Sequence, residues 1–277
     1  MKIAGAPISW GVCEVPGWGH QLSAERVLRE MHEVGLTATE YGPAGFLPPD
    51  PGPLLARYEL SALGGFVPVV LHEAASPSSI VDAFPGDVLV LAAATGRDGY
   101  DERPALDGAG WRRLLSTLDE FHDLAVSRGI RAVLHPHVGT MIETGPEVER
   151  VLEGSRIPLC LDTGHLLIGG TDPAVLAAHA ADRIAHVHAK DVDHSMARKV
   201  RAGDLTYTEA VARNMYRPIG DGDVDFAAVA AALGKQGYDG WWVLEQDTIL
   251  HDEPAGEGPV ADVRRSAEAL RALGYQV

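Results

Sequence analysis

Four short apolar segments of the sequence stop abruptly at residue types that bind metal ions: residues 132–137, 159–165, 185–191 and 241–247. Apolar runs of this length are typical of buried parallel β-strands. A (β/α)8 barrel carries its chemistry at the carboxyl ends of its strands, which all lie on one face. The sequence therefore predicts that four side chains meet there as nitrogen and oxygen ligands of a divalent cation. The four are His135, Asp162, His188 and Glu245.

Asp162 and Glu245 each follow an apolar run that should be buried. An unpaired carboxylate in such a place is costly, and metal binding would compensate for that cost. Asp162 is followed three residues later by His165, which would lie nearby as a further ligand or as a support for the ligands. The alternative for Asp162 is a simple helix cap.

His186, His188 and Lys190 fall on the same side of their predicted strand, because strand side chains alternate with a period of two. His188, which is nearer the strand end, is the better candidate for a metal ligand, and His186 fits the core. We predict that Lys190 is catalytic, as a general acid or base or as an oxyanion contact. The alternative is a solvated surface lysine.

His135 and His137 flank Pro136, so both can face the mouth of the barrel. One is expected to bind the metal and the other to contact the substrate, and the sequence does not order them. We assign the metal to His135 and a catalytic role to His137. Glu143 fits the approach to the next helix.

Further substrate contacts are expected at the ends of the early strands. Glu40 ends the second predicted strand and His72 the third, and a structural role is the alternative for both. Trp10 closes the first strand, where it would form an apolar wall for a bound ring or pack in the core. Together with His165, these residues make up the predicted substrate-binding set.

Eight segments are predicted strands, and helical patterns lie between them. The strands are residues 2–9, 38–41, 66–71, 88–93, 131–135, 159–161, 184–188 and 240–244. The helices follow Ser23 up to Gly35 and cover residues 111–128, 146–153, 173–181, 225–236 and 260–273. Residues 76–84 are too short for a full third helix. Eight alternating units imply a parallel sheet closed into one (β/α)8 barrel domain over residues 1–277.

Two stretches depart from this alternation. Residues 42–53 are too rich in glycine and proline for regular structure. Residues 191–223 form a long connection after the seventh predicted strand. Loops of that length are usually lids or binding loops, and a packing excursion without a role is the alternative.

The composition limits the kinds of partner. The 277 residues suit one such barrel, and the formal charge of −16 disfavours nucleic acid and anionic membrane surfaces, which need clustered Lys and Arg. No apolar run is long enough to span a membrane, and residues 1–11 fit a strand better than a signal peptide. Cys13 and Cys160 are too few for a disulfide framework. We expect a cytoplasmic protein with a small-molecule substrate; a homo-oligomer is compatible with the sequence.

With these motifs, the chain resembles the xylose isomerase-like TIM barrel superfamily, which includes sugar isomerases, epimerases, hydroxypyruvate isomerase and endonuclease IV. Within that superfamily it is most similar to myo-inosose dehydratase-like proteins. The resembling segments run from end to end of the chain. They are APISWG (6–11), TEYGPAGFLP (39–48), HPHVGTMIET (135–144), LDTGHLLIGGTDP (161–173), IAHVHAKDV (184–192), GDGDVDF (220–226) and YDGWWVLEQD (238–247).

The superfamily commonly binds its metal through Glu, Asp, His and Glu from strands five to eight. The resemblance carries three of these ligands onto Asp162, His188 and Glu245, whereas His135 falls where the strand-five Glu is expected. In the isomerases and epimerases the two Glu residues act on opposite faces of the reacting carbon. The departure at His135 therefore weakens the case for a two-base epimerase. A dehydratase needs one base beside a ketone and an acid for the leaving hydroxyl.

The resemblance thus implies a metal-dependent dehydratase, a carbon–oxygen lyase, acting on a keto-cyclitol such as 2-keto-myo-inositol. Mn²⁺ or Co²⁺ would suit the ligands best, with Zn²⁺ or Mg²⁺ as alternatives. Glu245 or a strand-five histidine would be the base, and Lys190 or the other histidine would assist the leaving hydroxyl. The alternative is a metal-dependent ketose or hydroxypyruvate-type isomerase or epimerase. An endonuclease IV-like hydrolase is disfavoured by the acidic charge, and a catalytically silent sugar-binding barrel is disfavoured because most metal ligands are present.

Overall fold

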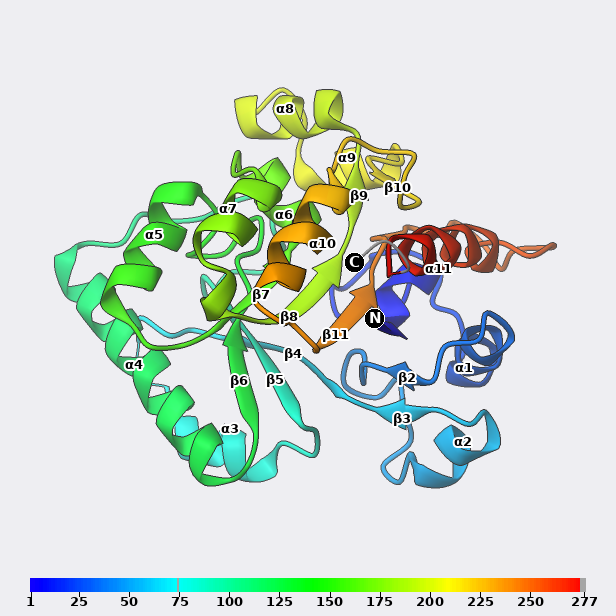
Figure 1. Ribbon diagram of the computed structural model, residues 1–277, viewed down its shortest axis with the longest axis horizontal. Helices are drawn as coiled ribbons and strands as arrows, with labels where there is room; N and C mark the ends of the chain where they lie inside the picture. Colours follow the sequence, from blue (N-terminus) through cyan, green and yellow to red (C-terminus); the bar gives the residue numbers. More distant parts are fainter. Residues whose placement is uncertain (74, 275–277) are drawn as a thin grey trace.

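Nine parallel strands form the central sheet of the computed structural model, which describes residues 1–73 and 75–274. The strand order is β3-β2-β1-β11-β8-β7-β6-β5-β4, with helices around the outside (Figure 1). The strands are β1 Lys2–Gly5, β2 Ala38–Thr39, β3 Ser61–Ala62, β4 Gly64–Val69, β5 Val88–Ala93, β6 Arg131–Leu134, β7 Leu159–Asp162, β8 Ile184–Ala189 and β11 Trp241–Leu244.

The segment formed by β3 and β4 closes the ring. β3 pairs with β2 and β4 pairs with β5, and only Leu63 separates the two strands along the chain. The Leu63 amide donates to the Thr39 carbonyl at 2.9 Å, and the Leu63 carbonyl accepts from the Asp87 amide at 2.8 Å. A Cβ on Gly64 would lie 1.9 Å from the Val88 carbonyl oxygen, so only glycine fits this close approach. The two pieces act as one strand, and the predicted (β/α)8 barrel is confirmed.

The helices follow the apolar stripes that the sequence indicates. Ser23 Oγ accepts a hydrogen bond from the Arg26 amide at 3.3 Å and caps the first helix, as expected. Leu114 and Phe121 of α4 are fully buried against the barrel. The helices are η1 Pro7–Trp10, α1 Ala24–Glu33, α2 Gly52–Arg57, α3 Pro77–Ala83, α4 Gly108–Ser127, α5 Gly145–Gly154, α6 Thr163–Ile168, α7 Pro173–His179, η2 Ala181–Arg183, α8 His194–Ala202, α9 Tyr207–Ala212, α10 Phe226–Lys235 and α11 Val260–Gly274.

Two predictions near the N-terminus need correction. The first strand ends at Gly5, not at residue 9, because Pro7 has no amide hydrogen for the sheet and begins the 3-10 helix η1. Residues 42–53 are not wholly irregular, since α2 starts at Gly52. The predicted short third helix agrees with α3, which has seven residues.

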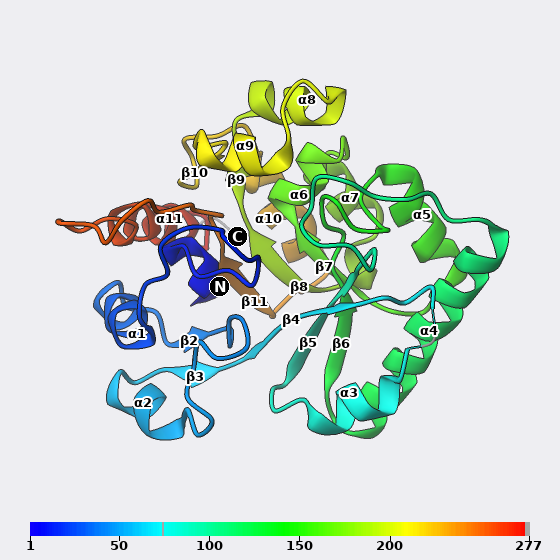
Figure 2. The ribbon, with the colours of Figure 1, turned by 180° about the vertical axis from the view of Figure 1, so that it is seen from behind.

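The long connection at residues 191–223 has structure of its own. It contains α8, α9 and two short antiparallel strands, β9 Asp191–Val192 and β10 Tyr216–Arg217. The four elements lie together beyond the tip of β8 in both views (Figures 1 and 2). The Asp191 carboxylate accepts from the amides of Gly220 and Gly222 at 2.8 and 3.0 Å and so fastens the end of the connection to its start.

Among residues 1–73 and 75–274, no helix combines the length and the apolar character needed to cross a membrane. Residues 275–277 lie outside the described residues. The extent of the predicted single domain, residues 1–277, therefore stays a prediction.

Candidate active site

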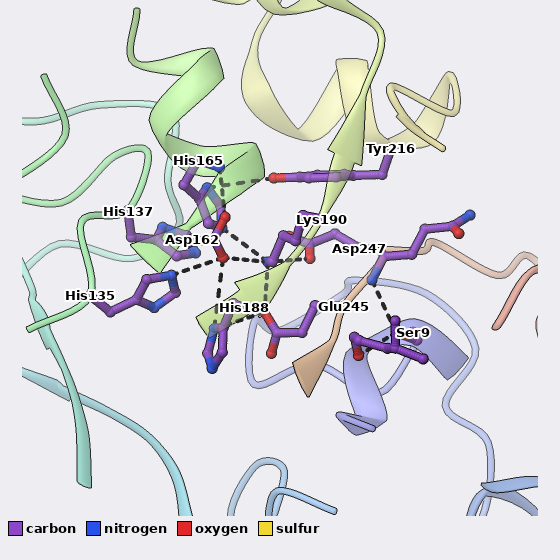
Figure 3. A network of polar contacts seen from close by, with 12 residues as sticks. Ser9, His135, His137, Asp162, His165, His188, Lys190, Tyr216, Glu245 and Asp247 are labelled. Carbon is purple, nitrogen blue, oxygen red and sulfur yellow. Dashed lines mark hydrogen bonds and ion pairs between the residues drawn. The ribbon is translucent and has the colours of Figure 1, made fainter. Parts of the chain in front are cut away.

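The carboxyl ends of four strands bring the predicted metal-binding side chains together (Figure 3). His135 Nε2 lies 3.0 Å from Asp162 Oδ2. His188 Nδ1 lies 3.1 Å from Glu245 Oε2 and 3.7 Å from Asp162 Oδ2. All four residues are buried. The barrel therefore places side chains from β7 and β8, and from the residues directly after β6 and β11, within one small volume.

Asp162 has both of the roles that its sequence position allows. Its Oδ1 accepts from the His165 amide at 2.7 Å and caps α6. Its Oδ2 faces His135 and His188 inside the barrel. The cap thus fixes the carboxylate so that its other oxygen points at the histidines inside the barrel.

Glu40 holds two histidines through a single oxygen. Its Oε1 accepts from His186 Nε2 at 2.9 Å and from His188 Nε2 at 3.0 Å. Burial raises the pKa of Glu40, but His188 and His186 outweigh that effect and hold the pKa below its ordinary value. The ionised carboxylate selects the His188 tautomer with its proton on Nε2, so Nδ1 is left facing the other carboxylates.

The residues fit a divalent cation. His188 Nδ1 is buried and, among the described residues, has no hydrogen-bond partner of good geometry, although two carboxylates lie opposite it. A positive charge has to lie between these groups. Burial lowers the pKa of His188, but Cys160, Glu245 and Glu40 raise it well above its ordinary value, so a proton fills that place when a metal does not. Imidazole and carboxylate donors suit Mn²⁺, Co²⁺ or Zn²⁺.

Lys190 is a buried lysine inside this acidic cluster, with only 2% of its surface exposed. Its Nζ lies 2.6 Å from Asp247 Oδ1 and 3.0 Å from Glu245 Oε2. Burial lowers the pKa of Lys190, but Asp247, Glu245 and Asp162 together raise it well above its ordinary value. Lys190 is therefore a buried ammonium group, and the alternative of a solvated surface lysine is excluded.

His137 and His165 stack on each other with their ring centroids 3.6 Å apart. Burial lowers the pKa of both rings well below the ordinary histidine value, and nearby positive charge on Lys190 acts in the same direction. Both rings are neutral at pH 7. His137 Nδ1 donates to the Val138 carbonyl at 2.7 Å, so its Nε2 carries the lone pair and can accept a proton.

Several side chains of this polar cluster line a cavity of about 310 Å³ at the mouth of the barrel. Apolar side chains, among them Ile8, Trp18 and Phe66, line the same cavity. A cavity with this mixed lining suits a small ring that carries both hydroxyl groups and C–H bonds. The charged and histidine side chains of the lining are Glu14, Glu40, His135, His137, His188, Lys190, Glu245 and Asp247.

Comparison with known proteins now adds to the geometry. The family model for the xylose isomerase-like TIM barrel matches residues 80–273. The chain belongs to the xylose isomerase-like TIM barrel family. The sequence-based resemblance to this family is thus confirmed, and the site lies at the barrel end where such barrels carry their chemistry.

Two curated relatives of this TIM barrel match over most of their length. The inosose dehydratase of Geobacillus kaustophilus (strain HTA426) is 30% identical, and the match covers 100% of this chain and 96% of that protein. The rhizopine catabolism protein MocC of Rhizobium meliloti is 33% identical over 89% of this chain and 82% of that protein. The resemblance to the inosose dehydratase branch is therefore confirmed.

A solved structure of the IOLI protein with a binding zinc atom has the same fold. Its TM-score is 0.66 at 13% identity, and the match covers 100% of this chain and 99% of that one.

Three predicted substrate contacts of this TIM barrel lie outside the cavity lining. Trp10 is fully buried, and its indole nitrogen donates to Glu30 of α1 at 2.7 Å, so it is a core residue. His72 lines a separate surface hollow with Leu106 and Arg113. His165 lies behind His137 and accepts from Lys190 Nζ at 3.1 Å. The first two predictions failed because they assumed that β1 and β4 run on to the mouth of the barrel.

Sequence reasoning missed several residues of the cavity, notably Asp247, Tyr207 and Tyr100. Asp247 had a signal, because it lies two residues after Glu245 and so shares its side of an extended chain. Tyr207 and Tyr100 belong to connections, where no periodic pattern indicates which side chain points inward. Glu143 bonds the Gly139 amide at 2.8 Å and pairs with Arg103, away from the metal-binding cluster.

Proposed function

We propose that this protein is a metal-dependent dehydratase, a carbon–oxygen lyase, that acts on a keto-cyclitol such as 2-keto-myo-inositol. The full-length match to the inosose dehydratase of Geobacillus kaustophilus carries the proposal. That match spans 100% of this chain, so every strand end that contributes to the site lies within it. The burial, charge and spacing of the site residues support the same chemistry.

We assign His135, Asp162, His188 and Glu245 to one divalent cation. Mn²⁺ or Co²⁺ suits these donors, with Zn²⁺ or Mg²⁺ as alternatives. When bound, the ion would polarise a ketone oxygen and so acidify the neighbouring C–H bond. Glu40 would keep His188 in the tautomer that presents Nδ1.

The remaining steps are proton transfers by groups of this chain. Glu245 takes the proton from the carbon beside the ketone, the electron pair forms a C–C double bond, and the C–O bond to the next hydroxyl breaks. Lys190 donates the proton with which this hydroxyl leaves as water. Both groups start in the protonation state that these roles require: His188 and Lys190 overcome the effect of burial and lower the pKa of Glu245, so it is ionised, and the pKa of Lys190 is raised, so it carries its proton. His137 is the alternative base.

Of the four residues assigned to the metal, one is a glutamate that can serve as the base, where a two-base site would have two. His135, directly after β6, stands where the resemblance leads one to expect the second glutamate, and its Nε2 lies 3.0 Å from Asp162 Oδ2. A stereochemical inversion needs bases on both faces of the carbon, whereas elimination needs a base and an acid. The pairing of Glu245 with Lys190 at 3.0 Å therefore favours elimination.

The direct test is turnover of 2-keto-myo-inositol by the Mn²⁺-loaded protein in D₂O, followed by proton NMR. We expect loss of water to an unsaturated or dione product. Glu245→Gln should lower kcat by about 10²- to 10⁴-fold, whereas the exposed control Glu268→Gln should leave it unchanged. Deuterium entry beside the ketone without loss of water would indicate an isomerase or epimerase instead. If neither change occurred, the keto-cyclitol assignment would be wrong.

A further inference from the structure

Lys190 lies where it would compete with a divalent cation. Its Nζ is 3.0 Å from Glu245 Oε2 and 3.7 Å from Asp162 Oδ2, and we assign both oxygens to the metal. A buried ammonium group and a divalent cation attract the same carboxylates and repel each other at short range. The site can hold both only if a further group draws the lysine to one side.

Asp247 is placed to do this. Its Oδ1 accepts from Lys190 Nζ at 2.6 Å, the shortest of the lysine's contacts with the three carboxylates. Asp247 is buried, with 7% of its surface exposed. His165 Nε2 also accepts a hydrogen bond from Lys190 Nζ, at 3.1 Å. The Tyr216 ring, whose centroid is 5.4 Å from Nζ, adds a cation–π contact.

Tyr207 fixes the second oxygen of Asp247. Its hydroxyl donates to Asp247 Oδ2 and lies 3.0 Å from the Tyr216 hydroxyl. Tyr207 is 2% exposed and is the first residue of α9, where the Thr206 side chain caps the helix. Thr208 Oγ1 donates to the Asp101 carboxylate at 3.0 Å and ties α9 to the loop that bears the cavity residue Tyr100. The connection at residues 191–223 thus places the buried Tyr207 hydroxyl against Asp247, the carboxylate that holds Lys190.

We propose that Asp247 and Tyr207 are positioning residues that anchor the Lys190 ammonium on the Asp247 side of the acidic cluster, 2.6 Å from Asp247 and 3.7 Å from Asp162, so that a lysine and a divalent cation occupy one acidic site side by side. The inference rests on the proposed function only in requiring a divalent cation, and not on the identity of the substrate. It gives the connection at residues 191–223 a definite role, which is to complete the placement of Lys190.

The test is the affinity of the protein for Mn²⁺, measured by isothermal titration calorimetry. Asp247→Asn and Tyr207→Phe are compared with wild type, and each is also made in a Lys190→Met background. We expect Asp247→Asn to weaken Mn²⁺ binding by about tenfold or more, because Lys190 then loses its shortest carboxylate contact and competes more strongly with Mn²⁺ for Glu245 and Asp162. Tyr207→Phe should cause a smaller loss. Neither substitution should weaken binding when Lys190 is Met.

The Lys190→Met background separates this role from a simple effect of charge. If the Asp247 carboxylate only attracted Mn²⁺, Asp247→Asn would weaken binding equally in both backgrounds, and the proposal would be wrong. Unchanged affinity of both single variants would also overturn it. Tyr207→Phe preserves charge and removes one hydroxyl, so it carries the test if Asp247→Asn does not fold. The matched control is Asp252→Asn, because Asp252 is exposed and lies, like Asp247, in the segment between β11 and α11.

Turnover of 2-keto-myo-inositol is measured separately. A wild-type protein that binds Mn²⁺ but does not dehydrate this substrate would contradict the proposed function, and the affinity pattern would still decide the inference. For an active wild type, we expect kcat of Tyr207→Phe to fall while KM changes little, because the displaced group is the proton donor.

Discussion

The two ring nitrogens of His188 face different carboxylates. Nε2 donates to Glu40 Oε1 at 3.0 Å, and Nδ1 faces Glu245 Oε2 at 3.1 Å. Since a neutral imidazole carries one proton, the bond to Glu40 decides which nitrogen is free to bind a metal. Glu40 was expected to contact the substrate, and it does line the cavity. Its bonds to two histidines favour a role in orienting His188.

This role predicts the behaviour of a Glu40→Gln variant. Without the carboxylate, the preference for a proton on His188 Nε2 weakens, so Mn²⁺ affinity should fall by about 10- to 100-fold. Calorimetric titration with Mn²⁺ measures the change, and Glu268→Gln on exposed surface is the control. A variant with wild-type Mn²⁺ affinity and a raised KM would instead support the substrate contact.

The sequence indicated the site residues unevenly. His135, Asp162 and Glu245 could be predicted because each ends an apolar run, where a buried polar group needs a reason. The predicted substrate contacts of Trp10 and His72 failed because an apolar pattern does not reveal where the chain leaves the strand and turns away from the barrel mouth. At Trp10 the bend is η1, which turns the chain directly after β1.

At the scale of elements, the Gly220–Asp223 turn fastens the long connection to the barrel. Asp191 accepts from the amides of Gly220, Gly222 and Val224 at 2.8 to 3.0 Å. Burial raises the pKa of Asp191, and these amides oppose that rise. The turn therefore fixes the chain beside Lys190, which directly precedes Asp191.

Gly222→Ala tests this attachment. A Cβ at residue 222 would lie 2.3 Å from Asp191 Oδ1, so the carboxylate would have to leave its amides. We expect a loss of about 1–3 kcal/mol in the free energy of unfolding, measured in urea. Gly256→Ala is the control, because no atom lies within 4 Å of its added Cβ. Equal stability of the two variants would show that the turn does not need the close approach.

The strands could be predicted better than the connections. Residues 88–93 form one apolar run, and β5 has these bounds because both of its faces are buried. The two helices of the long connection were not predicted. They have only nine and six residues. Apart from Ala197 the first has little buried surface, and the apolar stripe of the second is limited to Tyr207, Ala210 and Val211, which is too short to indicate a helix by its period.

At the scale of the whole molecule, barrel closure brings together residues that lie far apart along the chain. Glu40 follows β2 and Glu245 follows β11, yet each contacts His188 of β8. The eight alternating units predicted this closure from the sequence. The alternating pattern did not predict that Glu40 would bind the Nε2 side of His188. Such a contact depends on how far strands that are distant in sequence are shifted along one another in the closed barrel.

The four side chains assigned to the metal are the centre of the account, and anomalous diffraction from Mn²⁺-soaked crystals tests them most directly. We predict one strong peak at roughly 2.0–2.4 Å from His188 Nδ1 and from oxygens of Asp162 and Glu245, with His135 Nε2 as the fourth ligand. A peak between Glu40, His186 and His188 Nε2, or no peak at the strand ends, would contradict the account.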